Sequence, residues 1–239
     1  MNAPDHLPAT RFQEPSPLHG IRAVIVDLDG TMLDTAPDFL VAVNRMRAEL
    51  SLAALDIATI MSLVGKGTEN LVRSVLTIDL PPDDIERQFE RALASYHAHY
   101  LAFNGNGTTI YPGVLDGLMA LRNKNLRLAC VTNKPIAFTL PLLDKMQLRH
   151  YFDIVYGGDS LPRKKPDPYP LLQVCTDFGL SPHQVLAIGD SSNDAQAARA
   201  AGCPVLTVPY GYNHGQSVQL IDSDGIVATL LEAADLVSA

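Results

Sequence analysis

The chain has 239 residues, of which 47% are hydrophobic and only 18% charged, and it carries a formal net charge of −8. A chain of this size and composition buries a sizeable core without cross-links, which excludes intrinsic disorder, and its apolar runs are too short to span a bilayer. Its acidic balance and its lack of a basic stripe make nucleic acids and anionic membranes poor partners. We therefore expect a soluble globular protein.

The N-terminal segment and the cysteines favour a cytoplasmic location. Residues 1–19 are rich in proline and contain no apolar run of the kind found in signal peptides, so we expect a flexible tail and no export. Cys130, Cys175 and Cys203 lie far apart in the sequence, and they form no Cys-x-x-Cys pair that could bind zinc or carry redox chemistry. Such cysteines are typical of apolar packing in a reducing compartment.

Short apolar runs recur along the chain in the pattern of buried parallel strands. The first covers residues 21–27, and the others cover residues 126–132, 154–156, 185–188 and 205–208. Amphipathic segments of helix length separate these runs, and this alternation is the pattern of a parallel α/β sheet. We therefore expect an α/β protein with a three-layer, Rossmann-like core.

One long segment departs from this alternation. Between residues 37 and 110 the apolar residues recur with helical periodicity, as in Phe39, Val43 and Met46, and we find no convincing strand. A helical insertion at this point would lie over the carboxyl ends of the strands, where ligands bind in open α/β sheets. We expect a tail at residues 1–19, a core formed by residues 20–36 and 111–239, and a small α-helical cap at residues 37–110.

Polar side chains follow the predicted strands at the points where the strands end, and in a parallel sheet these ends meet at one edge. They are Asp27 and Asp29 after the first strand, Thr132 and Asn133 after the second, Lys165 after the third, and Asp190 and Asp194 after the fourth. Several carboxylates cannot all ionise cheaply at one place unless a cation pairs with them. Magnesium prefers carboxylates together with phosphate oxygens, so the sequence predicts a Mg²⁺ site that takes a phosphorylated ligand.

These motifs, taken in order, make the sequence similar to the haloacid dehalogenase superfamily of phosphatases. They are Asp27-x-Asp29-Gly-Thr, Thr132-Asn133, Lys165-Pro166 and Gly189-Asp190-x-x-x-Asp194. The resemblance extends from about residue 22 to residue 237, and the helical insertion matches the small α-helical cap of the family. The four motifs are specific together, although each one alone is weak.

The resemblance implies roles for the acidic residues. Asp27 would attack phosphorus and form an aspartyl-phosphate, and Asp29 would protonate the leaving alkoxide and then deprotonate the hydrolytic water. The Asp27 carboxylate, the Asp29 backbone carbonyl and Asp190 would bind Mg²⁺. The expected activity is therefore magnesium-dependent hydrolysis of a phosphomonoester.

The remaining motif residues would bind the phosphoryl group or support the groups that do. Thr132, Asn133 and Lys165 would contact its oxygens, and Thr132 and Lys165 would stabilise the charge that these oxygens carry in the transition state. Asp194 would orient Lys165 or a metal-bound water. The partner is a small phosphorylated metabolite, and the protein would act as a monomer or a small homo-oligomer.

Within the superfamily the sequence is similar to the bacterial phosphoglycolate phosphatases. The likeness rests on Gly65-Lys66-Gly67 in the cap, on Lys165-Pro166-Asp167-Pro168, and on the late segments that begin at Tyr210 and Asp222. It implies that the substrate is 2-phosphoglycolate and the products are glycolate and phosphate. Lys66 is the candidate for the cation that binds the substrate carboxylate, with a flexible surface turn as the alternative.

Other functions use the same groups. The same core would serve a phosphatase for a sugar phosphate or a nucleoside monophosphate. A β-phosphoglucomutase-like enzyme would need cap contacts that we do not identify, and Asp29 disfavours a haloacid dehalogenase, which needs neither a second acid nor a metal. A phospho-accepting switch without turnover is disfavoured by Asp29 too, because a general base at that position shortens the life of the phosphoenzyme.

Overall fold

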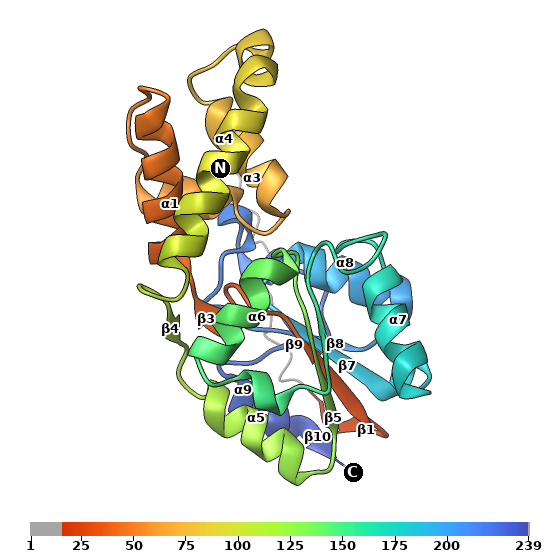
Figure 1. Cartoon of the computed structure of the whole chain (residues 1–239). Coiled ribbons are helices and arrows are strands. Elements are labelled where there is room, and N and C mark those ends of the chain that lie inside the picture. The colour runs from red at the N-terminus through yellow and green to blue at the C-terminus, as the bar shows by residue number, and fades with distance from the viewer. Residues whose placement is uncertain (1–15, 239) are drawn as a thin grey trace, which may run out of the picture.

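The computed structural model describes residues 16–238 (Figure 1). Most of the expected N-terminal tail therefore lies outside the described residues. Its last residues differ from the expectation, because β1 (Leu18–His19) pairs in parallel with β10 (Val237–Ser238). Leu18 packs against the main core, and this burial holds the segment in a strand.

A six-stranded sheet forms the centre of the molecule. Its order is β6-β5-β2-β7-β8-β9, and every neighbouring pair is parallel. The strands are β2 (Ala23–Val26), β5 (Arg127–Val131), β6 (Ile154–Tyr156), β7 (Val185–Gly189), β8 (Val205–Thr207) and β9 (Gly225–Ile226). The expected parallel α/β core is confirmed, and each of the five predicted runs overlaps one of these strands. The two-residue edge strand β9 is too short to give a sequence pattern of its own.

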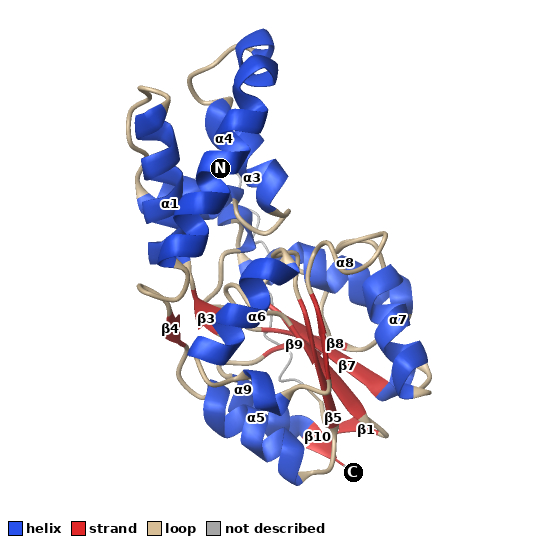
Figure 2. Ribbon diagram, in the orientation of Figure 1, coloured by secondary structure: helices blue, strands red, loops and turns tan. Residues whose placement is uncertain are grey.

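Helices cover both faces of this sheet (Figure 2). One face packs against α5 (Val114–Asn123), α6 (Ile136–Lys145) and α9 (Leu230–Leu236), and the other against α7 (Tyr169–Phe178) and α8 (Ser192–Ala201). Side chains alternate between the faces, so that in β2 Val24 joins one apolar cluster and Ile25 the other. The sheet and its two helical layers form the expected three-layer core.

Four helices occupy the predicted insertion. They are α1 (Ala36–Glu49), α2 (Ile57–Leu63), α3 (Thr68–Leu76) and α4 (Pro82–Phe103), and they share a separate apolar cluster. Phe138 of α6 is buried in that cluster. In Figure 2 these helices project from the carboxyl end of the sheet. Their packing agrees with an α-helical cap, and the exact domain boundaries stay a prediction.

The segment that leads into these four helices and the segment that leads out of them lie side by side. The strands β3 (Leu33–Asp34) and β4 (Thr109–Ile110) pair there in an antiparallel manner. The Asp38 carboxylate accepts hydrogen bonds from the backbone N–H groups of Gly105 (2.6 Å) and Gly107 (2.7 Å). These contacts tie the start of α1 to the end of the insertion.

The remaining elements are short. The 3-10 helices are η1 (Arg149–Tyr151), η2 (Pro182–Gln184), η3 (Asn213–Gly215) and η4 (Val218–Leu220). The three cysteines are buried and free, as expected. Within residues 16–238, none of the helices has the length and apolar character needed to cross a bilayer.

Candidate active site

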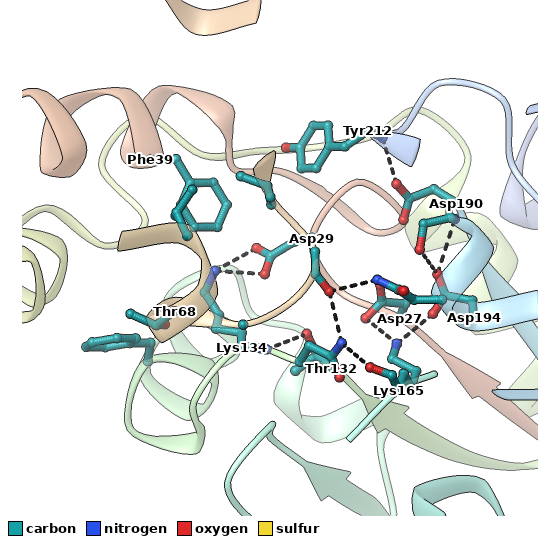
Figure 3. Close-up of a pocket in the computed structure, with 18 of the residues that line it drawn as sticks. Asp27, Asp29, Phe39, Thr68, Thr132, Lys134, Lys165, Asp190, Asp194 and Tyr212 are labelled. Carbon is teal, nitrogen blue, oxygen red and sulfur yellow. Dashed lines mark hydrogen bonds and ion pairs between the residues drawn. The ribbon is translucent and has the colours of Figure 1, made fainter. Parts of the chain in front are cut away.

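The polar residues predicted to follow the strands meet in one pocket between the sheet and the cap helices. The pocket has a volume of about 620 Å³, open mouth included, and the loops after β2, β5 and β7 line it together with residues of α1, α3, α4 and α6. Its lining includes Asp27, Asp29, Thr132, Asn133, Lys165, Asp190 and Asp194. Seven of the eight predicted site residues are thus neighbours (Figure 3).

Lys165 lies between two of the carboxylates. Its ammonium is 2.9 Å from Asp27 Oδ1 and 2.6 Å from Asp194 Oδ1, and it donates a third bond of 2.6 Å to the carbonyl of Val131. Burial alone would lower the pKa of Lys165, but Asp194 and Asp27 raise it above its usual value. Lys165 therefore stays charged, and its ion pair with Asp194 holds the ammonium in place.

Asp190 is held from several sides. The Thr31 hydroxyl donates to Asp190 Oδ1 (2.8 Å), and the Tyr212 backbone N–H donates to Oδ2 (2.7 Å). Two glycines leave the space that this carboxylate occupies, since a Cβ on Gly30 would lie 2.4 Å, and one on Gly211 2.2 Å, from Asp190 Oδ2. The chain around Asp190 is thus built to fix one carboxylate in one place.

The negative charges of the pocket outnumber the cation beside them. Asp27, Asp190 and Asp194 each offer an oxygen within 4.8 Å of the others. Burial is the main cause that raises the pKa of Asp27 to about 7 and that of Asp190 to about 8, and the neighbouring carboxylates add to both shifts. Carboxylate oxygens at this spacing fit a hard divalent cation, which would relieve their repulsion.

Asp29 is separated from this cluster by its own partners. The Lys134 ammonium donates to Asp29 Oδ1 (2.7 Å) and Oδ2 (2.9 Å), and the Thr35 hydroxyl donates to Oδ1 (2.7 Å). Lys134 also lies over the rings of Phe39 and Tyr100, with its ammonium 4.5 Å and 4.7 Å from their centroids. The two carboxylates of the Asp-x-Asp motif therefore have different cations.

Thr132 and Asn133 line the pocket on the β5 side. The Thr132 hydroxyl accepts a weak bond from the Lys134 backbone N–H (3.2 Å). The Asn133 amide donates to the backbone carbonyls of Lys165 (2.8 Å) and Gly65 (2.9 Å). Asn133 thus joins the loop that carries Lys165 to the loop that follows α2 in the cap.

The structure does not bring Lys66 into the pocket. Its side chain is exposed and is not among the residues that line the cavity, although Gly65 and Gly67 on either side are. Both glycines have positive φ, and Gly65 presents its carbonyl to the amides of Asn133 (2.9 Å) and Asn193 (3.0 Å). This turn directs the backbone toward the core and leaves the Lys66 side chain outside.

The sequence assigned no role to three further residues of the site. Lys134 directly follows Asn133 at a strand end, so its position was a signal, but its partner Asp29 is 105 residues away. Tyr212 gives no such signal, because it lies in a loop near the end of the chain. Its hydroxyl accepts a hydrogen bond from the backbone N–H of Thr35 (2.7 Å). Asn193 lies in the last motif, between Asp190 and Asp194, and contacts the cap.

Comparisons with known proteins agree with this geometry. The family model of haloacid dehalogenase-like hydrolases matches residues 24–208. A phosphoglycolate phosphatase of Nitrosospira multiformis is 54% identical over 217 residues, which is 91% of this chain and 96% of that protein. One from Thiobacillus denitrificans is 46% identical over 218 residues, covering 91% and 96%.

Solved structures show the same architecture. A predicted phosphoglycolate phosphatase from Haemophilus somnus superimposes with a TM-score of 0.84 at 30% identity, covering 91% of this chain and 98% of that one. The relatives confirm the expected enzyme class, a phosphoric monoester hydrolase. The chain belongs to the haloacid dehalogenase-like hydrolase family and is similar to the bacterial phosphoglycolate phosphatases.

Proposed function

We propose that the protein hydrolyses phosphomonoesters through an aspartyl-phosphate on Asp27, with Mg²⁺ as cofactor and 2-phosphoglycolate as substrate. The observation that carries the proposal is the pairing of Asp27 with the buried Lys165, beside Asp190 and apart from Asp29. A nucleophile, a fixed cation and a separate acid–base group are the parts that such a reaction needs.

Each residue has a defined task in this reaction. An Asp27 oxygen attacks phosphorus as the ester bond breaks, and Asp29 gives a proton to the leaving oxygen. Lys165 and the Thr132 hydroxyl bind the phosphoryl oxygens and stabilise their charge. Asp29 then removes a proton from the water that attacks the aspartyl-phosphate, which releases phosphate and restores Asp27.

The residues present fit a magnesium ion. Asp27 and Asp190 would hold it by their carboxylates and Asp29 by its backbone carbonyl, while Asp194 stays engaged with Lys165 at 2.6 Å. When bound, Mg²⁺ supplies positive charge to the phosphoryl oxygens and offsets the repulsion among the carboxylates. The raised pKa values of Asp27 and Asp190 support this assignment, because burial and, to a lesser extent, the neighbouring carboxylates disfavour the negative charge that a bound cation would offset.

The choice of 2-phosphoglycolate is supported by the named relatives and by the apolar side chains in part of the pocket wall. The pocket wall away from the carboxylates is aromatic and aliphatic, with Phe39, Leu71 and Phe138 among its residues. These three side chains offer no hydrogen-bond partners to the hydroxyls of a sugar or a nucleoside. A small leaving group suits this wall better.

A screen of phosphate release tests the proposal. The purified protein is offered phosphoglycolate, a hexose phosphate, a nucleoside monophosphate and ethyl phosphate, each with Mg²⁺ and with a chelator. We expect many turnovers on phosphoglycolate that stop on chelation. Full activity after exhaustive chelation would exclude the metal, a preference for another ester would exclude the substrate, and release of one phosphate per protein would indicate a switch instead of an enzyme.

A cytoplasmic location and a monomer or small homo-oligomer stay predictions.

A further inference from the structure

The pocket contains a buried ammonium that the proposed mechanism does not use. Among the described residues that line the pocket, Lys134 and Lys165 are the cations, and the Lys134 side chain is only 3% exposed. An ammonium has three donors, and within residues 16–238 the Lys134 ammonium donates only to the two oxygens of Asp29. One donor therefore remains for a ligand.

A second polar group beside Lys134 is unsatisfied. Tyr100 is 1% exposed and lines the same pocket, and its hydroxyl has no hydrogen-bond partner among the residues that the structure describes. Burial raises the pKa of Tyr100 well above its usual value, so the hydroxyl remains protonated and can donate. A buried hydroxyl without a hydrogen-bond partner lowers the stability of the fold. A ligand that accepts a hydrogen bond from Tyr100 would explain why this hydroxyl is present.

The surroundings of Lys134 favour an anion. The rings of Phe39 and Tyr100 flank its ammonium and exclude water from one side, and Figure 3 shows Lys134 reaching Asp29 from the side of Phe39. Attraction between a cation and an anion is stronger in such a dry site than in water. Lys165 is held beside Asp27 and Asp194, where the phosphoryl group would bind, so Lys134 is the cation left for a second anion of the substrate.

The position of Lys134 sets the reach of that anion. If Asp29 protonates the ester oxygen, that oxygen lies within hydrogen-bond distance of a carboxylate whose own oxygens are 2.7 and 2.9 Å from Lys134 Nζ. In a leaving group with its carboxylate on the ester carbon, a carboxylate oxygen lies three bonds, or about 3 Å, from the ester oxygen. Such a carboxylate can reach Lys134, whereas the phosphoryl group stays at Asp27 and Lys165.

We propose that Lys134 and the Tyr100 hydroxyl form the subsite for the leaving-group carboxylate and select phosphomonoesters that carry a carboxylate on the ester carbon. The inference rests on the proposed function and assigns its specificity to residues of β5–α6 and α4. It replaces Lys66, which the structure leaves outside the pocket.

The test compares two substrates that differ in the carboxylate, phosphoglycolate and ethyl phosphate, in three variants. We expect Lys134→Met to lower the ratio of the two kcat/KM values about 100-fold and Tyr100→Phe to lower it about 10-fold. Lys66→Met, the matched control, removes a lysine outside the pocket and leaves the ratio unchanged. The ratio is the informative quantity because any effect of Lys134 through Asp29 acts on both substrates.

Binding of the product gives a second readout that needs no turnover of the variant. Glycolate should inhibit the wild-type enzyme, and its inhibition constant should rise at least about 10-fold in Lys134→Met. Ethylene glycol, which has no carboxylate, serves as the control. If Lys134→Met does not fold, Tyr100→Phe decides, since it deletes only an unpaired oxygen and should keep or raise the melting temperature.

The outcomes separate the subsite from the proposed function. A wild-type enzyme that hydrolyses ethyl phosphate without preferring phosphoglycolate overturns the substrate assignment. A wild-type preference that survives in both Lys134→Met and Tyr100→Phe, or equal losses on the two substrates, overturns the subsite alone. Loss of the preference in Lys66→Met would return the role to the cap turn.

Discussion

Asp27 and Asp29 are two residues apart, yet their side chains have different surroundings. Asp27 lies beside Lys165 and Asp194, and burial raises its pKa to about 7. Asp29 lies against Lys134 and Thr35, on the side of the aromatic residues. Two carboxylates in separate environments can take separate roles in one reaction, as nucleophile and as acid–base group.

The role of Asp29 predicts a dependence on the leaving group. Asp29→Asn removes the proton donor, so alkyl phosphates, whose alkoxides are basic, should lose about 10²–10⁴-fold in rate. An aryl phosphate, whose leaving group departs without a proton, should lose much less in its first step. Single-turnover rates over a series of esters measure this. A loss of equal size across the series would contradict the assignment of Asp29 as general acid.

At the scale of loops, two turns converge on Asp190. A Cβ at position 211 would lie 2.2 Å from both Asp190 Cβ and Oδ2, so Gly211→Ala must move the carboxylate. We expect the Mg²⁺ concentration for half-maximal activity to rise at least about 10-fold, because the position of the Asp190 carboxylate is disturbed. Asp190→Ala, which removes this carboxylate, should raise it as well. Titration of activity with Mg²⁺ checks this. An unchanged requirement in Gly211→Ala would show that Asp190 does not hold the metal.

Among the helices, α1 carries a buried arginine that connects this helix to other segments of the cap. Arg47 is fully buried, donates to the carbonyls of Ala53 (2.7 Å) and Val75 (2.5 Å), and pairs with Asp79. Arg47→Met leaves these acceptors unpaired and should lower the free energy of unfolding by about 3 kcal/mol.

Denaturant unfolding of the two arginine variants measures the effect. The control is Arg87→Met, which breaks the ion pair of a 70% exposed arginine with Asp84 and should cost less than about 0.5 kcal/mol. Similar losses in the two variants would contradict the structural role of Arg47.

The sequence predicts the strand-end residues well because one rule governs them. The carboxyl ends of parallel strands meet at one edge, so Asp27, Thr132 and Asp190 could be brought together without a structure. The direction of a side chain in a turn follows no such rule. Lys66 and Lys134 both follow candidate motif residues, yet only the structure distinguishes the exposed lysine from the buried one.

For the whole molecule, the buried carboxylates link stability to pH and to metal. The folded pKa values of Asp27 and Asp190, about 7 and about 8, lie above the ordinary value of 3.8, so the metal-free folded protein binds these protons more tightly than the unfolded chain. Their contribution to stability is therefore present at low pH and is lost as the pH rises toward 7–8. A bound divalent cation would take the place of the protons.

The metal should thus stabilise the protein more at pH 8 than at pH 6. We expect the rise in melting temperature on adding Mg²⁺ to grow between about pH 6 and about pH 8, because fewer protons compete with the ion at the higher pH. In Asp190→Asn this growth should be reduced. A shift of the same size at both pH values would contradict the link between the cluster and the metal.

The proposed reaction depends most on a phosphoryl group carried by Asp27. The direct measurement is a rapid-quench reaction of the protein with phosphoglycolate and Mg²⁺, followed by mass spectrometry of the peptide that contains residues 21–34. We predict that this peptide gains one phosphoryl group during turnover, and that Asp27→Asn, which removes the attacking charge, forms no adduct and turns over several orders of magnitude more slowly while remaining folded. Near-normal turnover in Asp27→Asn, or a phosphoryl group on another residue, would contradict the account.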